Sequence, residues 1–176
     1  MGNRSSVGSR APRPVPLRTL WAPWRGRYLR QLGPRRCLFC VAKRPRDDRK
    51  HYVIYRGKMV FVILNLYPYN NGHLMIAPYR HVGTLDRVRE GEAVELLRVT
   101  SRMERLLTRA IRPHGFNVGL NVGRAAGAGI PGHLHVHVVP RWIGDTNFMP
   151  VLGHAKVISQ SLDELYRHLR RLQERT

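Results

Sequence analysis

The amino-acid sequence predicts a single α+β domain with an antiparallel sheet of about five strands, one long helix and a C-terminal helix. Short runs rich in β-branched and aromatic residues alternate with turn residues, which is typical of sheet-forming chains. Two other stretches repeat apolar residues at three- and four-residue intervals, as amphipathic helices do. A chain of 176 residues can bury one substantial core, and two independent domains are not expected.

The N-terminal segment, residues 1–18, is expected to be a flexible basic tail outside the folded domain of residues 19–176. It is rich in Ser, Gly, Pro and Arg and shows no periodicity. Order is expected to begin near residue 20, because Trp21 and Trp24 carry large aromatic side chains that favour burial. A turn-rich basic stretch follows over residues 37–48.

The strands are predicted from β-rich runs bounded by turn residues. The first two, residues 52–55 and 59–64, form a hairpin around Gly57. The third covers residues 73–77 and is stopped by Pro78. A fourth strand at 116–122 leads through a glycine-rich loop, residues 123–129, into a fifth at 134–139. The first three strands therefore form an antiparallel meander.

The two helices are predicted from their apolar spacing. In residues 85–112 apolar side chains recur every three or four positions among charged ones, and Pro113 and Gly115 end the pattern. Near the C-terminus, residues 161–164 form a capping box, and leucines at 162, 165, 169 and 172 follow along one helix face.

The charge balance favours anionic partners. The chain carries 31 Lys+Arg against 11 Asp+Glu, a formal net charge of +20. The excess is spread over the tail, the long helix and the C-terminus, so a nucleic-acid partner stays open but is not favoured. No segment approaches the roughly 18 apolar residues of a membrane span, and residues 1–18 lack the apolar region of a signal peptide. A cytoplasmic protein without membrane contact is expected.

A row of histidines gives the chain its most reactive feature. His133, His135 and His137 are spaced by two, so in a strand all of them lie on one face while apolar residues occupy the other. Imidazole titrates near neutral pH and can act as nucleophile, base or metal ligand. The alternative, a solvated face that happens to carry histidine, is less favoured for three aligned rings beside a glycine-rich loop.

The two cysteines, Cys37 and Cys40, form a Cys-Leu-Phe-Cys motif. In a cytoplasmic chain this spacing indicates metal binding or redox chemistry before a structural disulfide. The thioredoxin-like alternative is less favoured because no βαβ unit follows. If the motif binds a metal ion, histidines must supply the other ligands.

These features together resemble the histidine triad (HIT) superfamily, whose signature alternates histidines with apolar residues. The resemblance covers about residues 20–170. It includes segments 65–73 and 78–81, the glycine-rich loop and Pro140-Arg141-Trp142. Residues 20–25 and 144–150 look most like the branch of diadenosine tetraphosphate phosphorylases and HIT-family hydrolases. The resemblance also implies the HIT-like fold and a homodimer.

The resemblance implies a two-step displacement at the α-phosphate of an adenine-type nucleotide. His135 would attack phosphorus and form a nucleotidyl-histidine, because covalent catalysis divides one hard displacement into two. His137 would donate to a phosphate oxygen or to the leaving group. His133 completes the triad.

Nucleotide-binding roles are implied for Asn65, Asn121, His73, Gly127 and Gly129. Asn65 would hold the ribose hydroxyls, although a turn-capping Asn is an equal alternative. Asn121 would contact the α-phosphate, and the glycines would present backbone N–H groups to phosphate. His73 would line or support the site, with a structural histidine as the alternative.

In related proteins a Ser or Thr often sits five residues before the nucleophile. Here that position is Ile130, so a hydroxyl contact to phosphate is not expected.

The resemblance nominates His81 and His133 as partners of Cys37 and Cys40 in a zinc site. Two thiolates and two imidazoles suit zinc in a closed, structural site. The site would tie the N-terminal segment to the strand that carries His135, which is a supporting role rather than a chemical one.

The leading hypothesis is a hydrolase or transferase that cleaves phosphoanhydride bonds of dinucleoside polyphosphates. A phosphorylase with inorganic phosphate as acceptor and a nucleoside phosphoramidase are alternatives within the same chemistry. A nucleotide-binding module with vestigial chemistry is a second class. A third is an enzyme that removes adenylate from DNA ends; the charge of +20 leaves it open, but the additional zinc module of that branch is not recognised after residue 150.

Overall fold

The structure is a computed structural model, and it describes residues 37–45, 48–146 and 158–174. The predicted tail of residues 1–18, Trp21 and Trp24 lie outside these residues, as do residues 147–150. The domain boundary at residue 19 therefore stays a prediction.

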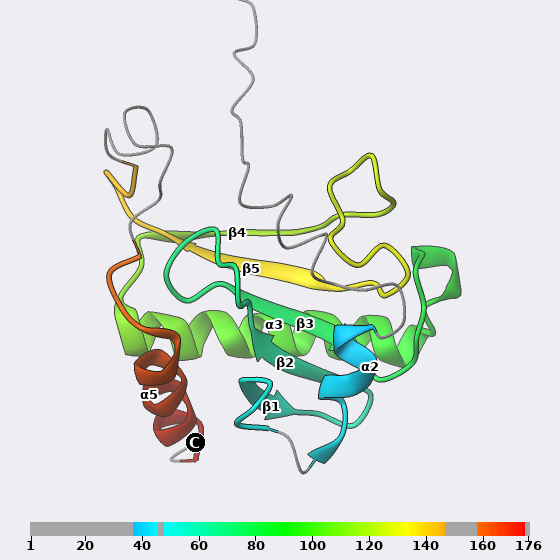
Figure 1. The fold of residues 1–176 in the computed structure, drawn as a ribbon, viewed down its shortest axis with the longest axis horizontal. Helices are drawn as coiled ribbons and strands as arrows, with labels where there is room; N and C mark the ends of the chain where they lie inside the picture. Colours follow the sequence, from blue (N-terminus) through cyan, green and yellow to red (C-terminus); the bar gives the residue numbers. More distant parts are fainter. Residues whose placement is uncertain (1–36, 46–47, 147–157, 175–176) are drawn as a thin grey trace, which may run out of the picture.

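A five-stranded antiparallel sheet forms the centre of the protein (Figure 1). Its strands are β1 (Val53–Arg56), β2 (Val60–Leu64), β3 (Leu74–Pro78), β4 (Gly115–Leu120) and β5 (Val136–Arg141). They lie in the order β1-β2-β3-β5-β4, so β5 is inserted between β3 and β4. The predicted α+β class and the antiparallel sheet are confirmed.

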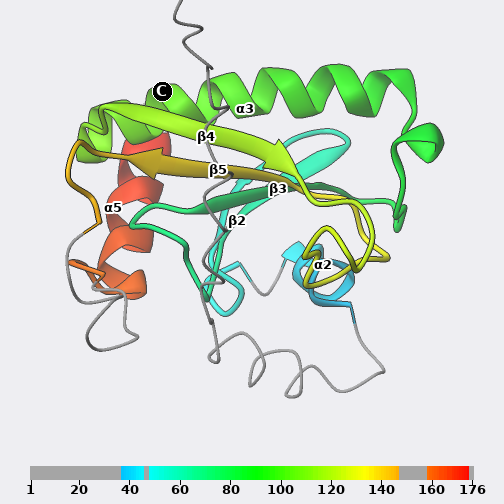
Figure 2. The ribbon, with the colours of Figure 1, turned by 90° about the horizontal axis from the view of Figure 1, so that it is seen from above.

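The helices lie on both sides of this sheet. Figure 2 shows α3 (Glu90–Ile111) on one side and the short α2 (Leu38–Ala42) on the other. The C-terminal α5 (Leu162–Glu174) packs against α3 and β1. In the described part of the chain, no helix is long and apolar enough to cross a membrane.

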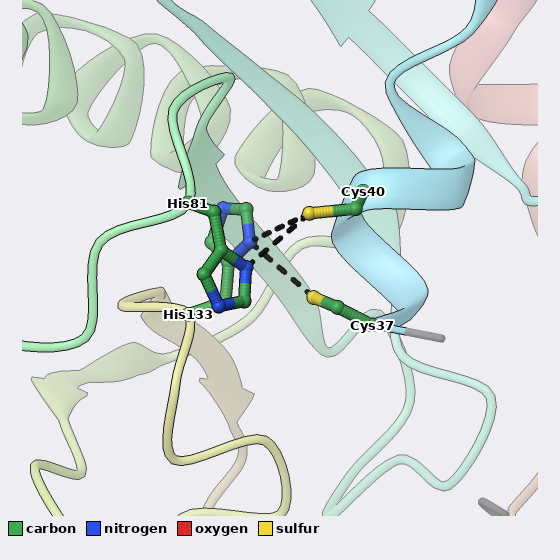
Figure 3. A group of neighbouring side chains, drawn as sticks. All are labelled: Cys37, Cys40, His81 and His133. Atoms are coloured by element: carbon green, nitrogen blue, oxygen red, sulfur yellow. Dashed lines mark hydrogen bonds between the residues drawn. The ribbon is translucent and has the colours of Figure 1, made fainter. Parts of the chain in front are cut away.

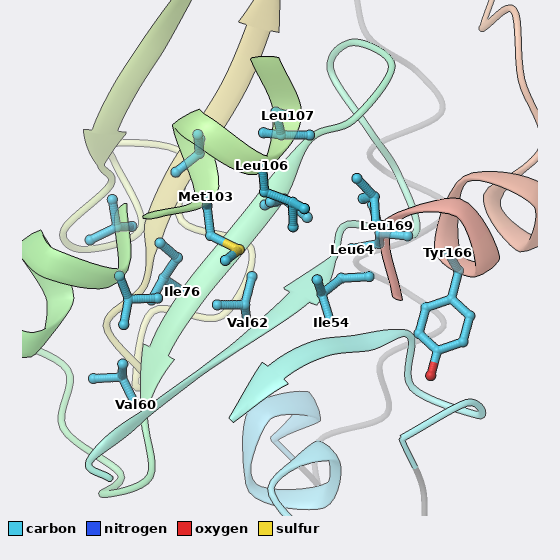
Figure 4. Close-up of a cluster of buried hydrophobic side chains, with 14 of the residues drawn as sticks. Ile54, Val60, Val62, Leu64, Ile76, Met103, Leu106, Leu107, Tyr166 and Leu169 are labelled. Atoms are coloured by element: carbon cyan, nitrogen blue, oxygen red, sulfur yellow. The ribbon is translucent and has the colours of Figure 1, made fainter. Parts of the chain in front are cut away.

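The larger core lies between the sheet and α3. Met103 of α3 is fully buried at its centre, among side chains of the sheet and of α5 (Figure 4). Truncating it to alanine would cost about 2–5 kcal/mol of stability, because a cavity would remain. A second, smaller cluster on the opposite face packs Phe39 of α2 against Phe61 and Met75. The sheet is therefore covered on both faces, and the second cluster borders the histidines.

Several predicted boundaries were wrong by one or two residues. The first strand begins at Val53, because Tyr52 has a positive φ of 53°. The predicted third strand begins at Leu74 and includes Pro78. The fourth ends at Leu120, before the glycine-rich loop. The fifth covers Val136–Arg141, so His133 and His135 precede its regular pairing.

Two predicted segments have a different internal structure. The helix expected over residues 85–112 is divided into the 3₁₀ helix η2 (Leu85–Arg87) and α3, because Val88 is extended with ψ of 130°. Pro113 follows the end of α3 as predicted. The turn-rich stretch 37–48 contains helix α2, which was not predicted. Five residues are too few for a periodic pattern to be recognised.

Candidate active site and metal centre

The three histidines 133, 135 and 137 lie on the face of the sheet opposite α3. Val136 and Val138 of β5 alternate with them and enter the core below α3. The predicted division into one apolar and one imidazole face is therefore correct. The histidines are not solvated: 0%, 5% and 8% of their surfaces are exposed, in chain order. Buried imidazoles need hydrogen-bond partners, and these partners define the site.

His135 is held in one protonation form by the backbone. Its Nδ1 lies 2.8 Å from the carbonyl oxygen of His133. Since a carbonyl only accepts hydrogen bonds, Nδ1 carries the proton, and the neutral ring has its lone pair on Nε2. Burial lowers the pKa of His135, against the opposing effect of the His133 carbonyl, so the neutral form is favoured near pH 7. A neutral imidazole with a free Nε2 lone pair is a competent nucleophile.

His137 is held in the opposite form by a chain of hydrogen bonds that begins at a backbone amide. The N–H of Tyr69 donates to Nδ1 of His73 over 3.0 Å, so the proton of the neutral His73 ring is on Nε2. That Nε2–H donates to Nδ1 of His137 over 2.9 Å. The proton of neutral His137 is consequently on its outer nitrogen, Nε2. His73 is fully buried and donates to His137, and a role for it in nucleotide binding stays a prediction.

The two catalytic candidates are adjacent and differ in what their outer nitrogens offer. The ring centroids of His135 and His137 are 4.7 Å apart. His135 presents a lone pair that can attack, and His137 presents a proton. A displacement needs both, because negative charge moves onto the leaving oxygen as the bond breaks. Nδ2 of Asn121 lies 3.4 Å from Nε2 of His137. Two N–H groups cannot hydrogen-bond to each other, so a protonated Nε2 of His137 requires the Asn121 amide to turn over and present its oxygen.

Asn65 shapes the turn before β3. Its Oδ1 accepts the N–H of Tyr67 over 2.9 Å, and its Nδ2 lies 3.3 Å from Nδ1 of His73. The turn-capping interpretation is therefore confirmed, and Asn65 also contacts the ring that supports His137. Only 8% of Asn65 is exposed.

The glycine-rich loop between β4 and β5 is a compact turn. Gly127 has a positive φ of 83°, which favours glycine, and its N–H donates to the carbonyl of Arg124 over 3.0 Å. That hydrogen bond uses the N–H group that Gly127 would offer to phosphate. Roles for Gly127 and Gly129 in phosphate binding stay predictions.

Cys37, Cys40, His81 and His133, the residues that the family resemblance nominated for a metal ion, lie together in one cluster. Their nearest ligand atoms all lie within 4.8 Å of one another (Figure 3). Nδ1 of His133 is 3.3 Å from Sγ of Cys37 and 3.7 Å from Sγ of Cys40, and Nδ1 of His81 is 3.3 Å from the latter. In a tetrahedral zinc site, such sulfur–nitrogen separations are about 3.5 Å.

The protonation form of His133 also fits a metal ligand. Its Nε2–H donates to the carbonyl of Pro78 over 2.8 Å, which leaves an unprotonated Nδ1 directed at the cysteines. Burial lowers the pKa of His133 to about 4, so the ring stays neutral and able to coordinate. His133 therefore belongs to both clusters, through its ring to the metal ligands and through its carbonyl to His135.

Two groups that contribute to the candidate active site were not predicted. Phe39, the aromatic residue between the cysteines, packs against the rings of His133 and His135. Its position within the Cys-Leu-Phe-Cys motif could have drawn attention to it. The second is the backbone N–H of Tyr69, which could not be predicted because every residue other than proline has such a group.

The chain is similar in sequence and in fold to known proteins. A family model described as the HIT domain matches residues 46–142. A Mycobacterium tuberculosis protein named AP-4-A phosphorylase is 44% identical over 161 residues, which cover 87% of this chain and 83% of that protein. A Schizosaccharomyces pombe bis(5'-nucleosyl)-tetraphosphatase (asymmetrical) is 30% identical over 89 residues, 51% of this chain and 48% of that one. A solved zinc-bound histidine triad family protein from Mycobacterium smegmatis has a TM-score of 0.64 and 26% identity, covering 81% of this chain and 96% of its own.

Proposed function

The chain belongs to the HIT domain family, and on that premise we propose that it transfers an adenylyl group from dinucleoside polyphosphates such as diadenosine tetraphosphate. It is an enzyme of that family, and the names of its relatives associate the family with nucleotide phosphorylase and tetraphosphatase activities. The observation that supports the proposal best is the pair of adjacent imidazoles with opposite protonation forms. His135 offers a lone pair and His137 a hydrogen-bond donor.

In the first step, the Nε2 lone pair of His135 attacks the α-phosphorus. A nitrogen–phosphorus bond forms, the phosphoanhydride bond breaks, and its electron pair goes to the leaving polyphosphate oxygen. The Nε2–H of His137 stabilises that oxygen by a hydrogen bond. In the second step, an oxygen of phosphate or water attacks the same phosphorus, the nitrogen–phosphorus bond breaks, and its electrons return to Nε2 of His135; an attacking water releases its proton to solvent.

Phosphate is the favoured acceptor. The support is the relative that is 44% identical over most of both chains and carries the name AP-4-A phosphorylase. Water as acceptor would make the enzyme a hydrolase. Asn65 is proposed to bind the ribose hydroxyls and Asn121 the α-phosphate, since both amides lie beside the His73–His137 pair.

The product assay tests this proposal and separates the acceptors. Purified protein is incubated with diadenosine tetraphosphate, with and without inorganic phosphate, and the nucleotides are quantified. Formation of ADP and ATP only in the presence of phosphate is expected; AMP and ATP without phosphate would identify a hydrolase. A panel with adenosine phosphoramidate and guanylyl analogues extends the test. No turnover of any adenylyl compound, or undiminished turnover by His135→Ala, would refute the proposal.

The metal cluster is proposed to hold zinc in a structural role. Two thiolates and two imidazoles complete a tetrahedral shell, and such a closed site supplies folding energy rather than a bound reactive water. Cys37 and Cys40 would thereby link α2 to the segment before β5. Thiolate ligands of this kind also accord with a cytoplasmic location, where thiols stay reduced.

A homodimer formed through β4 is proposed for the active protein. β4 is one edge of the sheet, and its side chains Val118 and Leu120 are 47% and 38% exposed. An exposed edge strand with apolar side chains is a template for pairing with a second copy. Light scattering after size exclusion should give twice the chain mass, and Val118→Lys should lower it. A wild-type monomer at all concentrations would exclude the dimer.

A further inference from the structure

Phe39 occupies an unusual position between the metal ligands and the proposed nucleophile. It lies in α2 between Cys37 and Cys40, and none of its surface is exposed. Its ring centroid is 4.8 Å from that of His135, with the planes tilted by 38°, and 5.0 Å from that of His133. The segment that carries two of the metal ligands therefore also touches the ring that performs the chemistry.

The hydrogen bond of His135 alone does not define where its Nε2 points. That bond holds Nδ1 at the carbonyl of His133, and the ring can still tilt about the hydrogen-bonded atom. The rings of Phe39 and His137 restrict this tilt, because their centroids lie 4.8 and 4.7 Å from that of His135. The contact with His137 is edge-on, with an interplanar angle of 65°.

The carbonyl of His133 belongs to a residue whose ring lies among the proposed metal ligands. The His133 ring is anchored through Nε2–H to Pro78, and its Nδ1 faces Cys37 and Cys40. The same residue thus presents one nitrogen to the metal site and its backbone oxygen to the nucleophile. Two routes join the metal site to His135: the Phe39 ring and the His133 backbone.

We infer that Phe39 is a positioning residue that holds the His135 ring in its attack orientation, with α2 clamped in place by the metal ligands. The inference rests on the proposed function of His135. A misplacement of about 1 Å can lower a rate by about 100-fold, so loss of the ring should be felt in kcat rather than in substrate binding. The aromatic neighbours of Phe39 are Phe61, His133 and His135, so we expect its loss to act through the His135 ring and to leave KM nearly unchanged.

The experiment compares Phe39→Leu and Phe39→Ala with Phe61→Leu. Phe61 is the matched control, because it is fully buried in the same cluster and contacts Phe39 edge-on at 6.3 Å. All proteins are loaded with zinc, and their metal content and melting temperature are measured. We expect full zinc content in each, similar stability losses for the two leucine variants, and a kcat lowered about 10- to 100-fold only where Phe39 is changed. KM should change less than about threefold.

A second measurement does not depend on turnover. Nitrogen-15 NMR of the histidine rings should show wild-type His135 as the Nδ1–H form with a single set of shifts. In Phe39→Leu the His135 signals should broaden or average, whereas in Phe61→Leu they should stay as in wild type.

The outcomes separate the two proposals. An active wild type together with unchanged kcat and unchanged His135 signals in both Phe39 variants would overturn the positioning role. Equal kcat losses in Phe39→Leu and Phe61→Leu would also overturn it, because the loss would then come from altered packing of the whole cluster. Loss of zinc from Phe39→Leu would overturn it too, because the loss of kcat would then follow from the missing metal ion. If Phe39→Ala fails to fold, the leucine pair decides. An inactive wild type whose His135 signals still respond to Phe39 would refute the proposed function and keep the positioning role.

Discussion

Replacing His73 by asparagine and by glutamine separates the two hydrogen bonds of this buried ring. His73 accepts from the Tyr69 N–H over 3.0 Å at Nδ1 and donates to His137 over 2.9 Å at Nε2. An asparagine amide reaches the place of Nδ1, and a glutamine amide reaches the place of Nε2. His73→Asn therefore keeps the acceptor for Tyr69, and His73→Gln keeps the donor to His137.

The magnitudes follow from what each variant leaves unpaired. In His73→Asn the Nδ1 of His137 loses its donor, and an unsatisfied buried acceptor costs about 1–3 kcal/mol. If that cost is felt in the transition state, kcat falls about 5- to 150-fold, since about 1.4 kcal/mol corresponds to a factor of ten. In His73→Gln the Tyr69 N–H loses its acceptor, which lowers the unfolding free energy by about 1–2 kcal/mol with kcat within about threefold of wild type.

The assay combines urea unfolding with kcat and KM for diadenosine tetraphosphate in the presence of phosphate. Both variants should lose stability, because each leaves a buried group unpaired, whereas kcat should fall only in the asparagine variant. Equal activity losses in the two variants, or a slower glutamine variant, would show that His73 does not determine the protonation form of His137.

Three further outcomes are expected. His135→Ala should abolish the nucleotidyl-protein and keep the fold intact, whereas His133→Ala should lose zinc and stability as well. The nucleotidyl-protein is trapped by denaturation at mildly alkaline pH and detected by mass spectrometry. Identical behaviour of the two variants would refute the division of roles. Cys37→Ser should lose bound zinc, which is measured by elemental analysis. The variant should also lose the roughly 2.7 kcal/mol that zinc at 100 times its Kd adds to the unfolding free energy. Full zinc content in the variant would refute the ligand assignment. Glu92→Gln should lower the unfolding free energy at pH 7 by up to about 1 kcal/mol, because the neutral amide loses the ion pair with the partly exposed Arg80 and keeps only one acceptor. The Arg80 guanidinium lowers the pKa of Glu92. This stabilisation is therefore complete above the unfolded glutamate pKa of about 4.3 and is lost as the pH falls through the lower pKa of the folded state. A difference in unfolding free energy between wild type and Glu92→Gln that grows on acidification would contradict this assignment.

Local patterns predicted much of the fold and failed where the chain departs from regular geometry. The apolar spacing located α3, but the extended Val88 separated η2 from it. Tyr52 lies before β1 because of its positive φ, which no alternation of side chains reveals. The predicted histidine face was correct although His133 and His135 precede the paired part of β5, because alternation persists in any extended segment.

The sequence by itself determined the chemistry that the site can hold. Residue spacing placed the three histidines on one face, and the Cys-Leu-Phe-Cys motif supplied half of the proposed metal ligand set, because both follow from backbone geometry over a few residues. Only the tertiary structure decided which partner each group meets. His133 faces cysteines 96 and 93 positions away, and His73 meets His137 across 64 positions, through the pairing of β3 with β5. Such contacts depend on strand register and on the seating of α2, which no local pattern encodes, and they determine which imidazole carries its proton outward.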